Sequence, residues 1–221
     1  MKVMICAGGT GGHVFPALAV AAAMKQRGHD ICWVGAPDSF ESRTVPQQGY
    51  PMEFIRVSGL RGKGLLKILF APLLILRAIA QAFAVLRRQQ PDVVLGMGGF
   101  ASGPGGIAAW LQRCPLVIHE QNAIAGFTNR CLALFAGQVL QAFPGAFAQG
   151  QTVGNPVRAQ IAALSAPSQR FAGRSGALRL LVIGGSQGAQ ALNERVPQAL
   201  AQISASQRPQ VRHQAGRTLA V

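Results

Sequence analysis

Short apolar runs that end in glycine-rich turns recur along this chain. Val3–Ala7 is apolar throughout, four glycines follow within Gly8–His13, and Val14–Val20 has the residues of a helix. This order predicts a βαβ unit whose loop holds an anion at the helix N-terminus. We expect Pro16 to lie early in the helix, where its missing N–H costs little. A strand-to-helix turn without a ligand has the same pattern, so this stretch alone leaves the ligand open.

The next predicted strand, Asp30–Val34, lacks a feature of dinucleotide sites. It ends in Gly35–Pro37, whereas a dinucleotide fold places an acidic residue there to bind a ribose hydroxyl. The preceding loop also contains His13, a titratable side chain, where dinucleotide loops have a small residue. Both features favour a phosphate-bearing or sugar ligand with an acid–base group beside it.

The pattern of strand and polar loop repeats in the middle of the chain. Pro91–Leu95 predicts a buried strand, Gly96–Gly106 a second glycine loop and Ile107–Gln112 a helix. A further strand, Leu116–Ile118, leads directly into the polar residues His119–Asn122. The carboxyl end of a parallel strand is where α/β sheets bind ligands, although a polar turn before a helix is the alternative. The other expected elements are a helix at 39–45, a strand at 52–57, a helix at 128–135 and a strand at 139–142.

The most apolar stretch, Leu65–Leu86, is long enough to span a bilayer. Lys67, Pro72 and Arg77 argue against a span, because bases are costly at the bilayer centre. We expect a helix or broken helix with one face on the sheet and the other on an anionic membrane surface. A wholly buried helix is the alternative. The residues expected at the membrane are Leu65, Lys67, Phe70, Leu74 and Arg77.

A strand, a glycine loop and a helix occur again near the end of the chain. Leu178–Ile183 is apolar, Gly184–Ala189 is the loop, and the helix is expected to extend to about Ile203. The polar stretch before them has the composition of an interdomain linker. We therefore expect an N-terminal Rossmann-like domain at 1–160, a linker at 161–177, and the start of a second, incomplete Rossmann-like domain at 178–221.

Net charge narrows the class of partner. The formal net charge is +14, from 21 Lys and Arg against 7 Asp and Glu. Such an excess predicts an anionic partner, which is a phosphorylated substrate or an acidic membrane face. We expect no nucleic-acid partner, because the sequence has no nucleic-acid-binding motif.

The cysteines and the N-terminus indicate the compartment. Cys6, Cys32, Cys114 and Cys131 are far apart, which predicts small buried side chains in a reducing compartment and not a disulfide framework or a metal site. Glycines interrupt the first apolar run, so we expect no secretion signal.

Five motifs in series resemble one family across nearly the whole chain. They are GGTGGH at 8–13, GGFASGPGG at 98–106, HEQN at 119–122, GNPVR at 154–158 and GGSQGA at 184–189. Together they resemble the glycosyltransferases of peptidoglycan synthesis that add N-acetylglucosamine to undecaprenyl-pyrophosphoryl-N-acetylmuramyl-pentapeptide. The resemblance implies an α/β fold of the GT-B class with two Rossmann-like domains, the second of them truncated.

The resemblance also implies an activity and its partners. UDP-N-acetylglucosamine would be the donor, and the acceptor's C4 hydroxyl would displace UDP with inversion, turning lipid I into lipid II. The protein would be peripheral on the cytoplasmic side of the cell membrane, on an anionic surface. We expect no metal or other cofactor, since loop amides and a helix dipole can stabilise the leaving UDP. The alternative is a truncated, non-catalytic module that binds the acceptor at the membrane surface.

Site residues follow from the matched motifs. His13 is the candidate general base, because a neutral imidazole accepts a hydroxyl proton near pH ~7. His119 and Glu120 are the other candidates for the base or for a residue that supports it. The remaining alternative is that His13 only binds substrate. The resemblance implies that the Gly8–His13 and Gly96–Gly106 loops face the acceptor's pyrophosphate, and that Thr10, Gly11 and Gly12 also contact the donor. The other expected donor-binding residues are Asn122, Arg158, Ser186 and Gln187. Expected acceptor-binding residues are Gly98, Gly99, Phe100, Ser102, Gly103 and Asn129. Phe100 stands where some members have a tyrosine. The acceptor half is expected to be complete and the donor half incomplete.

Overall fold

The computed structural model describes residues 1–57, 70–185 and 188–216. The chain divides into two compact units, Met1–Ala163 and Leu164–Val221. Four residues singled out from the sequence lie outside the described residues; they are Leu65, Lys67, Ser186 and Gln187.

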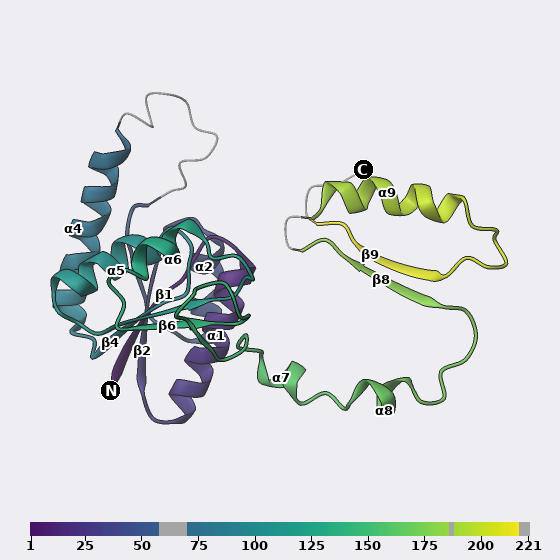
Figure 1. Cartoon of the computed structure of the whole chain (residues 1–221), viewed down its shortest axis with the longest axis horizontal. Helices are drawn as coiled ribbons and strands as arrows, with labels where there is room; N and C mark the ends of the chain where they lie inside the picture. Colours follow the sequence, from purple (N-terminus) through teal and green to yellow (C-terminus); the bar gives the residue numbers. More distant parts are fainter. Residues whose placement is uncertain (58–69, 186–187, 217–221) are drawn as a thin grey trace. The chain divides into compact units, whose positions relative to one another are not determined.

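The first unit is built on a parallel sheet of seven strands in the order β3-β2-β1-β4-β5-β6-β7. Figure 1 shows this unit with its helices packed around the strands. Its strands are β1 (Lys2–Cys6), β2 (Asp30–Gly35), β3 (Met52–Phe54), β4 (Val93–Gly96), β5 (Leu116–Glu120), β6 (Gln138–Gln141) and β7 (Gln151–Thr152). The chain adds β2 and β3 on one side of β1 and then crosses to β4 on the other side. The loops after β1 and β4 are therefore neighbours at the carboxyl edge and lead to helices on opposite faces of the sheet, at the position where α/β sheets bind ligands. This doubly wound topology agrees with the Rossmann-like fold predicted for this part of the chain.

Each face of the sheet has its own hydrophobic cluster. Val3 and Ile5 of β1 belong to one cluster together with Trp33, whereas Met4 and Cys6 belong to the other. Successive strand residues point to opposite faces. A strand covered on both faces is therefore apolar throughout, which is why the apolar runs located the central strands.

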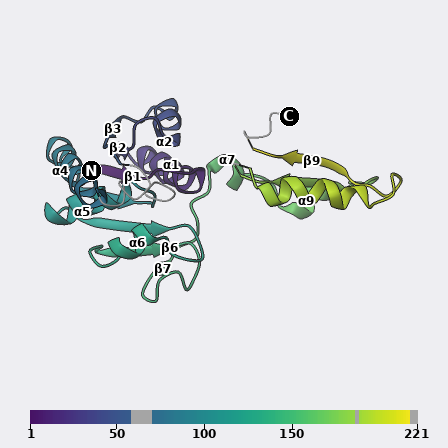
Figure 2. The ribbon, with the colours of Figure 1, turned by 90° about the horizontal axis from the view of Figure 1, so that it is seen from above.

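Helices cover both faces of this sheet (Figure 2). Helix α1 packs on the cluster that contains Ile5, and α4, α5 and α6 contribute to the cluster that contains Met4. The helical segments are α1 (Gly11–Gln26), α2 (Phe40–Thr44), the 3-10 turn η1 (Pro46–Gln48), α4 (Ala71–Gln89), α5 (Ser102–Leu111), α6 (Phe127–Leu132) and α7 (Ala159–Ala162).

Two predicted helix starts need correction. Helix α1 already begins at Gly11, so Pro16 is its sixth residue and lies inside the helix. Helix α5 begins at Ser102, whereas the glycines before Ile107 suggested a loop. Gly105 belongs to the helix because it lies against β1, where a Cβ would stand 2.5 Å from the Sγ of Cys6.

Helix α4 has one buried face and one exposed apolar face. Ala78, Ala82 and Val85 are buried, and Ala82 and Val85 belong to the cluster that contains Met4. Leu73 and Leu76 are 64% and 63% exposed, so a wholly buried helix is wrong for the described part of this stretch. Within residues 1–57, 70–185 and 188–216, no helix is both long and apolar enough to cross a membrane.

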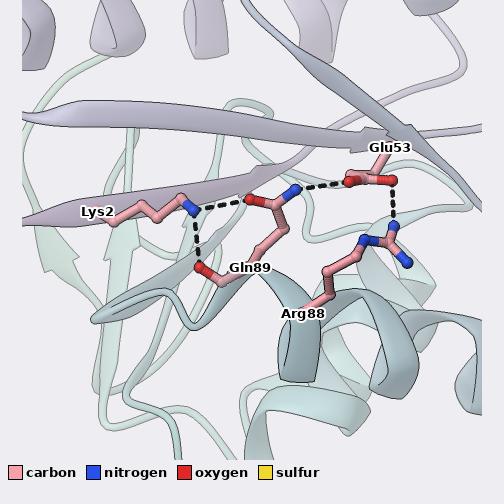
Figure 3. Close-up of polar contacts among 4 residues, drawn as sticks. All are labelled: Lys2, Glu53, Arg88 and Gln89. Atoms are coloured by element: carbon pink, nitrogen blue, oxygen red, sulfur yellow. Dashed lines mark hydrogen bonds and ion pairs between the residues drawn. The ribbon is translucent and has the colours of Figure 1, made fainter.

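A polar network ties the carboxyl end of α4 to the sheet. Lys2 Nζ donates to the carbonyl oxygen and the Oε1 of Gln89, at 2.8 and 2.7 Å (Figure 3). Gln89 Nε2 and Arg88 Nη2 each donate to Glu53, at 2.6 Å. These bonds join β1, β3 and α4, whereas the exposed leucines of α4 lie toward its other end.

The cysteines follow the prediction only in part. Cys6 and Cys32 are buried, and burial raises the pKa of both thiols, that of Cys32 to about 11. Cys114 is half-buried and Cys131 is exposed. Cys131 lies on the solvent side of the short helix α6, whose neighbouring residue Leu132 takes the buried position.

The second unit contains a small βαβ arrangement. Strands β8 (Arg179–Ile183) and β9 (Gln210–Gln214) pair in parallel, helix α9 (Gln190–Ala201) lies between them in sequence, and α8 (Pro167–Phe171) precedes them. Val182 is the one buried hydrophobic side chain among its described residues, and Leu181 is 63% exposed. The apolar pattern predicted β8 and α9. It missed β9, which has a single apolar residue, and the short helices α7 and α8.

Candidate functional site

Two glycine loops touch at the carboxyl edge of the first unit's sheet. One connects β1 to α1 and the other connects β4 to α5. The N–H of Gly8 donates to the carbonyl of Gly98 across 3.4 Å. A Cβ on Gly99 would overlap the carbonyl oxygen of Gly8, and the φ of Gly99 is +83°, a conformation that only glycine adopts at little cost. Gly98 and Gly99 therefore bring the two loops into backbone contact.

His13 lies where the loops meet. It belongs to the first turn of α1, and its Nδ1 stands 2.8 Å from where a Cβ of Gly98 would be. The ring is half-buried, and its Nδ1 lies 2.9 Å from the Oε1 of Gln121. Thr10 is the N-cap residue of α1 and is exposed, as is Gly12, while Gly11 is half-buried. The free N–H groups at a helix start attract anions, so this turn offers an anion site beside an imidazole.

Glu120, at the end of β5, is fully buried among hydrogen-bond donors. Its Oε1 accepts from the backbone N–H and the Nδ2 of Asn122, at 3.0 and 2.9 Å. Its Oε2 accepts from the N–H of Gly126 and the Nδ2 of Asn129, both at 3.0 Å. Burial alone would raise the pKa of Glu120, but these four bonds outweigh it and hold the pKa below its ordinary value. The carboxylate is thus a brace for the loop after β5, and this favours its role as a support over its role as a base.

The two asparagines that bind Glu120 differ in exposure. Asn129 is 1% exposed, and its Nδ2 donates to the carbonyl of His119 as well as to Glu120. Its Oδ1 is buried without a hydrogen-bond partner in the described part of the chain. Asn122 is exposed. Of the two, Asn122 presents its amide to solvent.

His119 is buried on the opposite side of β5 from Glu120. Its Nε2 lies 3.0 Å from the carbonyl oxygen of Gly154, and its Nδ1 lies 3.1 Å from the Nε2 of Gln121. Burial lowers the pKa of His119, against smaller raising effects of the Gly154 bond and the Glu120 charge. The ring is therefore neutral near pH ~7 and joins the GNPVR motif to HEQN.

Gln121 connects two of the candidate site residues, although the motifs implied no role for it. It is 5% exposed and bridges His13 to His119. A signal for it was present, because strand side chains alternate between faces. Val117 packs on the cluster beside α1, and Ile118 packs on the other cluster. The same alternation puts His119 and Gln121 on the α1 side.

Ser102 supports the second glycine loop from within. It was expected to bind an acceptor, but its side chain is fully buried. Its Oγ accepts from the N–H of Gly98 at 3.0 Å and donates to the carbonyl of Cys6. The hydroxyl is thus occupied by the backbone of the two strand ends.

Glu41 supports the first glycine loop and was not singled out from the sequence. This residue of α2 is 2% exposed, and its carboxylate accepts from the N–H groups of Gly9 and Ala36, at 3.0 and 3.1 Å. The amide of Gly9 is therefore already bound to a protein carboxylate. A glutamate in a short polar helix is typical of a surface residue, so its burial had no sequence signal.

The remaining expected residues lie around or away from this cluster. Phe100 is 51% exposed and lies near Gly9, and Gly103 lies near Thr128 of α6. The guanidinium carbon of Arg158 stands 5.0 Å from the ring centre of Phe15 on α1. Phe70, Leu74 and Arg77 are exposed on or beside α4 and are not part of the cluster.

Comparison with known proteins identifies the family. Residues 3–141 match the glycosyltransferase family 28 N-terminal domain, and residues 179–220 match the C-terminal domain of that family. The chain is 57% identical, over 97% of its length and 60% of the relative's, to a UDP-N-acetylglucosamine–N-acetylmuramyl-(pentapeptide) pyrophosphoryl-undecaprenol N-acetylglucosamine transferase of Marinobacter nauticus. A Vibrio cholerae protein of the same name is 56% identical, over 98% of the chain and 60% of that protein.

A solved structure agrees with these matches. The crystal structure of Acinetobacter baumannii MurG superposes with a TM-score of 0.78 at 41% identity, covering 98% of this chain and 61% of that one. The predicted family resemblance and the GT-B class of α/β fold are thereby confirmed. The chain spans about 60% of the length of the curated relatives it matches.

Proposed function

Because the chain belongs to glycosyltransferase family 28, we propose that it acts in the transfer of N-acetylglucosamine from UDP-N-acetylglucosamine to undecaprenyl-pyrophosphoryl-N-acetylmuramyl-pentapeptide. The names of its relatives describe this transfer. One observation in this chain carries the proposal: the imidazole of His13 lies at the junction of two glycine loops, at the ligand-binding edge of a doubly wound sheet.

The proposed chemistry is a single inverting displacement. The C4 oxygen of the acceptor attacks the anomeric carbon of N-acetylglucosamine, the bond from that carbon to UDP breaks, and the hydroxyl proton passes to His13. A positioned imidazole is suited to this step because its ordinary pKa is close to neutral pH. Glu120 does not take the proton, because its carboxylate oxygens each accept two hydrogen bonds inside the protein.

The acceptor's pyrophosphate is proposed to bind at the start of α1. The N–H groups of Gly11 and Gly12 and the helix dipole favour an anion there. The amides of Gly9 and Gly98 contribute less, because Glu41 and Ser102 already occupy them.

Other exposed groups would contact the two sugars and the donor. Phe100 would stack on a sugar ring, and Asn122 would bind a sugar hydroxyl. Arg158, which is exposed over Phe15, would pair with the donor diphosphate.

The exposed apolar face of α4 supports a place on the membrane surface. Leu73 and Leu76 are more than half exposed, Phe70 is 55% exposed, and Arg77 adds a positive charge beside them. We propose that this face rests on the cytoplasmic leaflet, where anionic lipids attract basic residues.

Replacing Leu73 and Leu76 together by serine should reduce co-sedimentation with phosphatidylglycerol vesicles several-fold. An Ile161→Ser control, which alters an exposed residue of α7, should bind as the native chain does; equal binding by both variants would contradict the proposal.

A direct assay tests the transfer. The chain would be incubated with radiolabelled UDP-N-acetylglucosamine and a lipid I analogue, and label in the lipid product would be counted. Label that appears only with both substrates supports the proposal, and its absence at high enzyme concentration contradicts catalysis by this chain.

A second candidate function is binding of the lipid-linked acceptor without transfer. It is favoured by one observation: the described cluster from His13 to Asn129 belongs wholly to the first unit, Met1–Ala163. Saturable binding of the lipid I analogue, measured by calorimetry, with no label transferred, would support this candidate over the first.

A further inference from the structure

We propose that Gln121 is a positioning residue that fixes the tautomer of His13, with the proton on Nδ1 and the lone pair on Nε2. The inference rests on the proposed function only in that His13 is the base. The assignment itself follows from which of the contacting atoms can donate and which can only accept a hydrogen bond.

The orientation of the Gln121 amide is set by His119. A backbone carbonyl only accepts, and the carbonyl oxygen of His119 lies 3.0 Å from the Nε2 of Gln121. The opposite orientation would place two oxygens against each other at that distance. Met97 agrees with this orientation, since its sulfur, a weak acceptor, lies 3.9 Å from the same nitrogen. The amide oxygen of Gln121 therefore faces His13.

The ring of His119 completes the orientation. Its Nε2 faces the carbonyl of Gly154 at 3.0 Å and must donate. Its Nδ1 faces the Nε2 of Gln121 at 3.1 Å, which is a donor, and must accept. His119 is therefore neutral, with its proton on Nε2. Both hydrogens of the Gln121 amide are occupied, one by the His119 ring and one by its carbonyl, so the amide cannot rotate without losing both bonds.

The tautomer of His13 then follows. The Oε1 of Gln121 lies 2.9 Å from the Nδ1 of His13 and can only accept, so this nitrogen carries the proton. A neutral imidazole has one ring proton, which leaves the lone pair on Nε2. The hydrogen bond at one ring nitrogen thus determines the chemistry of the other.

This arrangement balances the proton transfer of the proposed reaction. The acceptor hydroxyl loses its proton to the Nε2 of His13, and the Nδ1–H stays bonded to Gln121 throughout. Without the glutamine, neutral His13 would spend part of its time with Nε2 already protonated and unable to accept. Gln121 acts through His13 and touches no reacting atom.

Nitrogen-15 NMR of the histidine rings reads the tautomers directly. The chain has 4 histidines, and spectra would be recorded near pH ~8, above the ordinary histidine range. We expect a protonated Nδ1 and a bare Nε2 for His13, and the reverse for His119. A native His13 that is protonated on Nε2 overturns the proposal, whether or not any variant folds.

Two glutamine variants test the cause. Gln121→Met removes the amide and should convert His13 to a mixture of tautomers. Gln141→Met is the matched control, because Gln141 is also buried and bonds through both amide atoms, to Gly150 and Phe147. It should leave His13 unchanged. An unchanged His13 tautomer in Gln121→Met, with the native fold retained, contradicts the proposal.

Transfer kinetics separate this inference from the proposed function. Gln121→Met should lower kcat about tenfold, with KM for the acceptor nearly unchanged, and Gln141→Met should not. If the tautomers are as expected but His13→Ala transfers at the native rate, the base assignment fails and the tautomer assignment stands. If His13 is needed for transfer but its Nε2 is protonated, the role of Gln121 fails and the proposed function stands.

Discussion

Two hydrogen-bond networks begin at neighbouring residues of β5 and differ in how they end. The Glu120 network is closed: its carboxylate is fully buried and accepts four hydrogen bonds from the loop and helix that follow. The network from His119 through Gln121 ends at His13, whose ring is half-buried. Because strand residues alternate between faces, one short motif supplies a brace on one side of the sheet and, on the other, the residues that hold His13. Removing a member of the first network should affect folding, and removing the end of the second should affect chemistry.

The largest effect is expected from opening the closed network. Glu120→Ala removes the acceptor of the Gly126 N–H and one of the two acceptors of Asn129 Nδ2, and a buried donor left unpaired, as on Asn129, costs about 1–3 kcal/mol. We expect a loss of unfolding free energy of about 3 kcal/mol or more, measured by urea denaturation. The fluorescence of Trp33 and Trp110, the chain's 2 tryptophans, reports on the first unit. Glu53→Ala, which breaks a more exposed network, is the control, and a similar loss in both variants would contradict the distinction.

His13→Ala tests the open end. We expect the transfer rate to fall tenfold or more, which corresponds to at least about 1.4 kcal/mol of lost transition-state stabilisation. The free energy of unfolding should change by less than about 1 kcal/mol, because the ring is half-buried. His29→Ala, beyond the other end of α1, should keep the native rate. A rate loss below tenfold would remove His13 from the role of base.

Acid should weaken both networks, each in its own pH range. The pKa of His119 is lowered in the folded state, mainly by burial, so the unfolded chain binds its proton first and stability falls as pH drops below the ordinary histidine value of ~6.5. The pKa of Glu120 is also lowered, so its contribution is complete above the ordinary glutamate range and is lost as pH falls through the folded-state pKa. Urea denaturation from neutral pH down to below the ordinary glutamate range should show both losses of unfolding free energy. In His119→Gln the first loss should shrink, and a full-sized first loss in that variant would contradict the assignment.

The smallest effect is expected at the exposed edge of the closed network. Asn122→Ala removes the side-chain bond to Glu120 but keeps the backbone bond. A net loss of about 0.5–1.5 kcal/mol is expected in urea denaturation. If Asn122 also binds a sugar hydroxyl, the transfer rate should fall even where the variant is fully folded. A native transfer rate would show that Asn122 only bonds to Glu120.

Apolar patterning was sufficient for the central fold but not for the supports of the site. The runs at Val3–Ala7 and Pro91–Leu95 located β1 and β4, because strands buried on both faces are continuously apolar. β9 was missed because it has one apolar residue among polar ones. Helix α5 was placed too late, because its glycines serve close packing and not a turn.

The same limit applies to the site. The glycine loops, His13 and HEQN stood out by residue type and order. Glu41 did not stand out, and Ser102 was expected to bind the acceptor. Both bind backbone groups that come close only in the folded chain, so the sequence alone did not reveal this role. Gln121 could have been assigned to the α1 side from strand alternation alone, but its partner His13 is 108 residues away in the sequence.

Glu41 has a consequence for the speed of ligand binding. Its carboxylate holds the amides of Gly9 and Ala36 in the folded protein before any ligand arrives. The entropy lost in ordering the first glycine loop is therefore part of folding and is not subtracted from the binding free energy. A preorganised loop of this kind needs no slow rearrangement when the ligand arrives. The observed rate constant of association should therefore rise linearly with ligand concentration, without the plateau that a loop-closing step produces.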